Sequence, residues 1–152
     1  MSTGVDKAIK RADGDAIEFA AVRQAPVELG SAVVTPAGNL AARAVIHAVS
    51  LDRDRRTSGA VIDAAVRSAM ARAREIKATS IAFPALGTGV GGYPLDDAAL
   101  VTVRAVRDEL PNSPTIQHVI FAMRGAAPYE AFEAAMAATV DEAQGTTPQG
   151  VA

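Results

Sequence analysis

The sequence predicts a single α/β domain in which strands pair in parallel and helices cover them. Four short apolar runs alternate with longer segments whose apolar residues recur every three or four positions. The runs are almost continuously apolar, which is typical of strands that are covered on both faces. A length of 152 residues suits one domain.

The expected strands are short and rich in β-branched residues, as in Val33-Val34 and Val119-Ile120-Phe121. The expected order is helix, strand, strand, helix, strand, helix, strand, helix. The strands are placed at residues 31–35, 44–51, 79–84 and 117–123.

The helices follow from apolar spacing and end signals. Residues 5–24 form a helix broken near Gly14, and residues 57–77 form one capped by Thr57 or Ser58, with Asp63 and Arg67 as an i,i+4 pair.

Two more apolar stripes indicate helices, one of them ended by Pro111 and Pro114. We expect a domain over residues 1–144 and a flexible tail over 145–152. The stripes are Leu100, Val103, Val106 and Leu110, and then Tyr129, Phe132, Met136 and Val140.

Charge and composition exclude several classes of protein. The 15 Lys+Arg and 17 Asp+Glu give a net charge of −2, which argues against specific DNA binding or an anionic membrane surface. The absence of Cys removes disulfides and thiolate metal sites. His47 and His118 have no carboxylate cluster beside them, so we expect structural histidines, no metal and no cofactor. With neither a signal peptide nor a membrane-spanning run, we expect a cytoplasmic protein.

The segment most informative about function is the loop at residues 83–94. It holds four of the 12 glycines within six residues, between an expected strand and an expected helix. Glycines let main-chain N–H groups converge, and a helix N-terminus adds unpaired donors and a positive dipole end. The loop therefore predicts a phosphate-binding site with Thr88 as a hydroxyl donor. The alternative is a tight turn that needs positive φ angles.

Two further interpretations concern the glycines and the acidic residues. Gly87, Gly89 and Gly92 match GxGxxG, so a Rossmann-like NAD(P)-binding domain is an alternative. However, the motif lies late in the chain, and no acidic residue stands at the end of the next strand.

Gly4 precedes the first helix, where Asp6 would act as an ordinary capping carboxylate. Asp96 and Asp97 are expected in the first turn of a helix.

With these segments in view, the sequence resembles the macro domain family of ADP-ribose-binding modules from about residue 3 to 140. Three separated motifs occur in the family's order: residues 4–14, residues 30–40 with Val45-Ile46-His47, and residues 87–94. The resemblance implies a three-layer α/β/α macro-type fold with a mixed, largely parallel sheet. The implied partner is ADP-ribose or an ADP-ribosylated protein.

The resemblance also implies which residues form the site. The first glycine segment and the loop would face each other across the diphosphate, Tyr93 would cover the distal ribose, and Phe121 or Met123 would lie near the adenine. The implied ligand-binding residues are Gly4, Val5, Gly87, Thr88, Gly89, Val90, Gly91, Gly92, Tyr93, Phe121 and Met123.

In the hydrolase branch of the family, the position of Asp6 supplies a carboxylate near the ribose C1″. It would position or activate a water molecule that releases ADP-ribose from a side chain or an O-acyl group, so Asp6 is the candidate catalytic residue. The capping interpretation of Asp6 stays open, as does the choice between an ADP-ribose reader and a hydrolase of ADP-ribosyl or O-acetyl-ADP-ribose linkages.

The chain departs from the family at its start. Family members begin with strands that carry Gly-Asp-Ile and Asn-Ala-Ala-Asn segments, which this sequence lacks. The resemblance therefore implies an N-terminally truncated domain with a gap in its sheet. Further strands could be encoded upstream, the strands could close up or form a homo-oligomer, or another chain could donate strands; we expect the first. A non-binding remnant that acts through oligomerisation is a further alternative.

Overall fold

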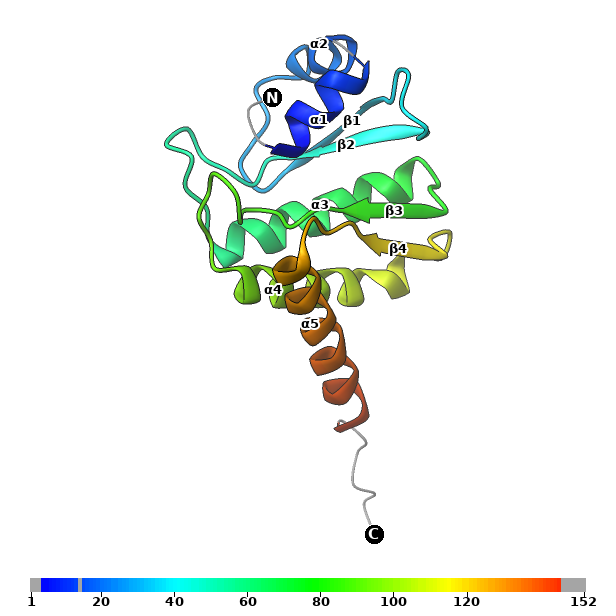
Figure 1. Ribbon diagram of the computed structural model, residues 1–152. Coiled ribbons are helices and arrows are strands. Elements are labelled where there is room, and N and C mark those ends of the chain that lie inside the picture. Colours follow the sequence, from blue (N-terminus) through cyan, green and yellow to red (C-terminus); the bar gives the residue numbers. More distant parts are fainter. Residues whose placement is uncertain (1–3, 14, 146–152) are drawn as a thin grey trace.

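The computed structural model describes residues 4–13 and 15–145 (Figure 1). It confirms the α/β class and the expected order of helices and strands. The elements are α1 Gly4–Asp13, α2 Ala16–Val22, β1 Ala32–Pro36, β2 Ala44–Ala48, α3 Gly59–Glu75, β3 Ser80–Phe83, α4 Leu95–Glu109, a 3-10 turn Leu110–Asn112, β4 His118–Phe121 and α5 Ala126–Gly145. Gly14 and residues 146–152, where a helix break and a tail are expected, lie outside the described residues.

The strands form two separate pairs within the described residues. In the β3–β4 pair, which is parallel as expected, Ile81 lies opposite Val119. The β1–β2 pair is antiparallel, with Val33 opposite His47. A short connection, residues 37–43, joins β1 to β2, which suits an antiparallel hairpin and is too short for a crossover.

Helices cover both faces of the β1–β2 pair. Figure 1 shows α1 and α2 on one side of it and α3 on the other, and α2 and α3 both contact β1. Ala32, Ile46 and Ala48 belong to the core that α3 and α4 share with β3. Among the described helices, none has the length and apolar character that would let it cross a membrane.

The core is centred on α3, where Ile62, Val66 and Met70 are fully buried. Ser58 is the residue that caps this helix, because its hydroxyl accepts a hydrogen bond from the Val61 N–H at 3.3 Å. The expected first-turn positions of Asp96 and Asp97 are also confirmed, in α4.

The helix α5 buries a different face from the one that its apolar stripe indicates. Tyr129, Met136 and Val140 are exposed, while Phe132 is buried. Small residues of α5 pack instead against Ala99 and Val103 of α4, which lets the two helices approach closely. Among the α5 residues up to Val140, the buried ones are Ala131, Phe132, Ala135 and Thr139.

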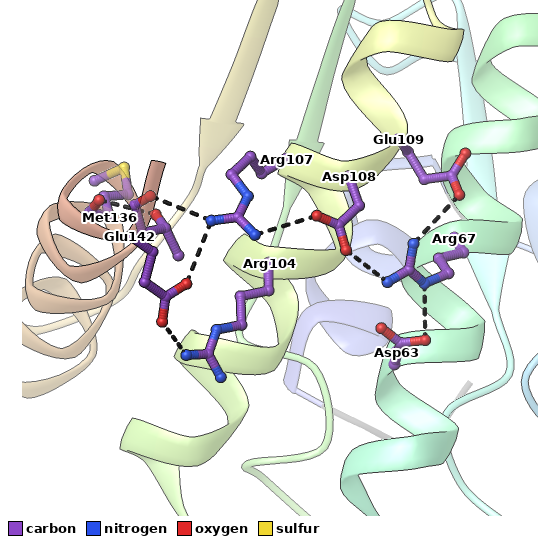
Figure 2. A network of polar contacts seen from close by, with 9 residues as sticks. Asp63, Arg67, Arg104, Arg107, Asp108, Glu109, Met136 and Glu142 are labelled. Atoms are coloured by element: carbon purple, nitrogen blue, oxygen red, sulfur yellow. Dashed lines mark hydrogen bonds and ion pairs between the residues drawn. The ribbon is translucent and has the colours of Figure 1, made fainter. Parts of the chain in front are cut away.

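Ion pairs connect α3 with α4, and α4 with α5 (Figure 2). The expected Asp63–Arg67 pair is confirmed at 2.8 Å, and Arg67 of α3 also reaches Asp108 of α4 at 3.0 Å. These carboxylates raise the pKa of Arg67. At the α4–α5 contact, Arg104 and Arg107 both pair with Glu142.

Candidate functional site

A cleft of about 1040 Å³ opens between the two strand pairs. Residues of β2 and β3 line its length, the first turn of α1 lines it from one side, and residues 84–91 line it at the carboxyl end of β3. Gly4, Val5 and Asp6 therefore share one cleft with Gly87–Gly91. Ligands of open α/β sheets bind beyond the carboxyl ends of strands, which is where this loop lies.

Gly4, Val5 and Asp6 form the first turn of α1, so Gly4 begins the helix rather than preceding it. The first four N–H groups of an α-helix have no partner within the helix, and the helix dipole makes this end favourable for an anion. Val5 is exposed and Asp6 is half-buried. This turn thus brings main-chain donors and one carboxylate to the cleft.

The glycine loop is folded by its own hydrogen bonds. The Tyr93 N–H donates to the Gly87 carbonyl at 3.0 Å, and the Gly92 N–H donates to the Gly89 carbonyl at 3.1 Å. Among the described residues, the backbone N–H groups of Leu86, Gly87, Gly89, Val90 and Gly91 have no backbone acceptor. The loop closes on itself and leaves a run of donors available to a ligand.

The glycines of the loop serve two different purposes. Gly87 has a φ of +77°, and a Cβ on Gly91 would lie 2.7 Å from the Gly87 carbonyl oxygen, so both are required by the loop itself. Gly92 also has a positive φ, of +61°. By contrast, Gly89 lines the cleft and a Cβ there would meet nothing within 4 Å. The tight-turn interpretation accounts for three of these glycines and leaves Gly89 unexplained.

The structure separates the remaining expected site residues into two groups. Thr88, Val90 and Met123 line the cleft, although the Thr88 hydroxyl donates to the Ala85 carbonyl at 2.9 Å. Outside the lining are Gly92, Tyr93 and Phe121.

Packing within the core explains why Tyr93 and Phe121 lie outside the lining of the cleft. The Tyr93 ring is half-buried in the main core, with its hydroxyl at the start of α3 beside Gly59. The Phe121 ring packs on Phe132, with a centroid separation of 5.2 Å. Neither ring lines the cleft.

His47 lies on β2 and lines the cleft. Its Nε2 is 2.9 Å from the Thr35 Oγ1, so the expected hydrogen-bonded strand histidine is confirmed. Burial lowers the pKa of His47, and the negative charge of Asp6 opposes that shift. Within the part of the chain that the structure describes, no three His, Cys, Asp or Glu side chains gather to hold a metal ion.

Two arginines at the cleft were not singled out from the sequence. Arg43 precedes β2 and Arg124 follows β4; both are exposed, and both line the cleft. Arg124 could have been found, because it lies just beyond the carboxyl end of a strand. These side chains add the only arginine charges among the described lining residues.

Comparison with known proteins decides the family. The Macro domain model matches residues 1–102. The chain belongs to the macro domain family. The glycine loop of this macro domain follows its third strand, and the Rossmann-like alternative is therefore wrong.

Relatives of this macro domain include proteins of different lengths. An uncharacterized protein of Mycobacterium tuberculosis is 45% identical over 141 residues, which are 93% of this chain and 39% of that protein. The chain thus spans well under half of that relative. An O-acetyl-ADP-ribose deacetylase of Salmonella typhimurium is 40% identical over 124 residues, which are 78% of this chain and 69% of the enzyme.

Solved structures share the fold. The Oceanobacillus iheyensis macrodomain with ADP superimposes with a TM-score of 0.79 at 22% identity, over 91% of this chain and 77% of that one. The Trypanosoma brucei macrodomain in complex with ADP gives a TM-score of 0.79 at 26% identity, over 87% of this chain and 56% of that one.

Proposed function

We propose that this macro domain binds ADP-ribose, free or attached to a protein, with its diphosphate between the first turn of α1 and the glycine loop. The observation that carries the proposal is that Gly4–Asp6 and Gly87–Gly91 line one cleft. Relatives support it, since one is an O-acetyl-ADP-ribose deacetylase and two solved macrodomains hold ADP, which contains the same diphosphate.

The physical basis is anion binding by main-chain donors. A helix N-terminus and a glycine loop each present N–H groups to an anion without the desolvation cost of a buried Lys. Arg43 and Arg124 add positive charge at the cleft. Because these arginines are exposed, salt weakens their contribution to binding of the diphosphate, whereas the main-chain donors retain their contribution.

Titration calorimetry with ADP-ribose tests binding. Gly89→Val places a side chain in open space at the cleft without a backbone clash, so we expect at least a tenfold loss of affinity and an unchanged melting temperature. Ala138→Val, on the exposed face of α5, is the control and keeps full affinity. Wild-type protein that gives no heat at millimolar ADP-ribose, or equal affinity in Gly89→Val, would count against this site.

We further propose that Asp6 acts in hydrolysis of ADP-ribosyl or O-acetyl-ADP-ribose linkages. Asp6 is half-buried at the cleft, beside the donors that would hold the diphosphate. A carboxylate so placed can accept a proton from water as the water attacks the linkage, and such general-base assistance contributes about 10²–10⁴-fold.

The capping role of Asp6 is separated from catalysis by measuring two quantities. Asp6→Asn should lower turnover of O-acetyl-ADP-ribose by about 10²-fold or more, while ADP-ribose affinity and the melting temperature change little. A variant that loses stability but retains turnover per folded molecule would assign Asp6 to capping alone. Binding without turnover in the wild type would assign the domain to the readers.

A further inference from the structure

A second, smaller pocket lies next to the cleft, just beyond the carboxyl end of β2. Its volume is about 310 Å³, and four apolar and two charged residues line it: Val27, Leu29, Val49, Leu51, Asp52 and Arg53. Val49 and Leu51 also line the cleft, so the two hollows share a wall. A molecule bound in the cleft can therefore extend across this wall into the smaller pocket.

The segment that carries Arg53 rests on the glycine loop. A Cβ on Gly91 would lie 2.7 Å from the Leu51 side chain and 3.0 Å from the Thr57 side chain, so both ends of residues 51–57 adjoin this loop. Figure 1 shows the same relation, with the connection from β2 to α3 beside the connection from β3 to α4. The smaller pocket therefore lies at the end of the cleft where the glycine loop is.

Hydrogen bonds fold residues 52–56 into a tight turn with three arginines and two aspartates. The Asp52 N–H donates to the Arg56 carbonyl at 2.9 Å, and the Arg56 N–H donates to the Asp52 Oδ1 at 2.7 Å. Arg53, Arg55 and Arg56 are exposed, and none of them forms an ion pair within the described part of the chain. Asp52 already accepts a bond, whereas the guanidinium of Arg53 is available at the pocket to a carboxylate.

The rest of the pocket suits an apolar side chain. Leu29 is 46% exposed although it is a large apolar residue, and it lines the pocket with the half-buried Val27, Val49 and Leu51. Covering these side chains removes apolar surface from water, which is favourable. An apolar hollow with one available charged group is typical of a site that fixes an apolar group beside an oppositely charged one.

We infer that the smaller pocket is a subsite for the protein segment to which ADP-ribose is attached. It takes an apolar side chain that lies close in sequence to the modified residue, and Arg53 pairs with a carboxylate of the same segment. The inference rests on the proposed function, because it needs ADP-ribose in the cleft. Joined in one molecule, the two contacts reinforce each other, since the second forms at a high effective concentration. Free ADP-ribose uses the cleft alone.

Calorimetry with free ADP-ribose and two modified peptides tests the apolar contact. Acetyl-Glu-Leu-X-Leu-Glu-amide is the probe and acetyl-Gly-Gly-X-Gly-Gly-amide is its control; X carries ADP-ribose through a triazole, which resists hydrolysis. The probe has leucine on both sides of X, so it serves either chain direction. We expect the probe to bind about tenfold more tightly than the control, or better, as burial of one leucine side chain allows.

Two leucine variants locate the apolar contact. Leu29→Ser should remove the preference for the probe, while the affinity for free ADP-ribose and the melting temperature change little. Leu110→Ser is the matched control, because Leu110 is 38% exposed in the 3-10 turn and lines neither hollow. It should keep the full preference.

A charge exchange tests the role of Arg53. A third peptide, acetyl-Lys-Leu-X-Leu-Lys-amide, replaces both glutamates by lysine. At low salt the wild type should prefer the glutamate peptide to the lysine peptide by about two- to fivefold, the range of an exposed ion pair. Arg53→Glu should reverse this order and leave the affinity for free ADP-ribose unchanged.

The remaining outcomes separate this inference from the proposed function. Wild-type protein that binds free ADP-ribose but all three peptides equally well would overturn the subsite and leave the proposed function intact. A preference for the probe that survives in Leu29→Ser would place the segment elsewhere, and an unchanged order in Arg53→Glu would remove Arg53 as its partner. Wild-type protein that binds neither ADP-ribose nor the peptides would overturn the proposed function and the subsite together.

Discussion

The Oγ1 of Thr35 and the Nε2 of His47 lie 2.9 Å apart across the β1–β2 pair. Thr35 is 2% exposed, and its partner His47 is half-buried. Burial favours the neutral imidazole, which explains why the pKa of His47 lies below its ordinary value of 6.5, while Asp6 opposes the shift. The neutral ring and the threonine hydroxyl therefore share a hydrogen bond at the wall of the cleft.

Acid should destabilise the domain through His47. Because the folded pKa is lowered, the unfolded state binds more protons below about pH 6.5, so the free energy of unfolding falls as pH decreases through that range. Urea unfolding from pH 8 to pH 5 measures this dependence. His47→Gln should flatten it, while the exposed His118→Gln should keep the wild-type slope. An unchanged slope in His47→Gln would contradict the assignment.

Substitutions at Gly91 and at Gly89 should have different effects on the free energy of unfolding. A Cβ on Gly91 would lie 2.7 Å from the Gly87 carbonyl oxygen and from the Leu51 side chain, whereas one on Gly89 meets nothing within 4 Å. Gly91→Ala should therefore cost about 1–3 kcal/mol of unfolding free energy. Thermal and urea unfolding compare it with Gly89→Ala, which should remain close to wild type. Similar losses in the two variants would show that the loop relaxes freely.

Phe132 should dominate the packing of α5. Its side chain is 1% exposed and contacts Phe121, while Tyr129 on the same helix is 59% exposed. Phe132→Ala should lower the free energy of unfolding by about 3–5 kcal/mol. Tyr129→Ala should change it by about 0.5 kcal/mol or less. If denaturant curves show the larger loss for Tyr129→Ala, the face of α5 that carries Tyr129 is the buried one.

Arg67 should contribute modestly to the free energy of unfolding, and this contribution should depend on salt concentration. It joins Asp63 on its own helix to Asp108 and Glu109 on α4, in partly exposed pairs (Figure 2). Arg67→Met should cost about 1 kcal/mol at low ionic strength, and less at 1 M salt because exposed ion pairs are screened. Glu75→Gln breaks a pair with Arg72 inside one helix and serves as the control. Unfolding curves at two salt concentrations measure both, and a salt-independent loss would point to packing.

The secondary structure was predictable because its signals are local. Apolar runs such as Val119-Ile120-Phe121 became strands, and Ser58 lies where a helix cap was expected. The face of α5 was not predictable, since Met136 and Phe132 are equally apolar in sequence. Only the neighbouring α4 decides between them, by presenting small side chains that let Ala131 and Ala135 come close.

The candidate site also combines parts that the sequence predicts with parts that only the tertiary structure decides. The sequence by itself predicted the glycine loop, because glycine freedom and helix-end chemistry act over a few residues. Asp6 entered the candidate site through the resemblance to the macro domain family. Only the tertiary structure brought residues 4–6 and 87–91 to one cleft and directed the Phe121 ring at Phe132 rather than at that cleft. Those outcomes depend on strand pairing and helix packing between residues distant in the chain, which no local pattern encodes.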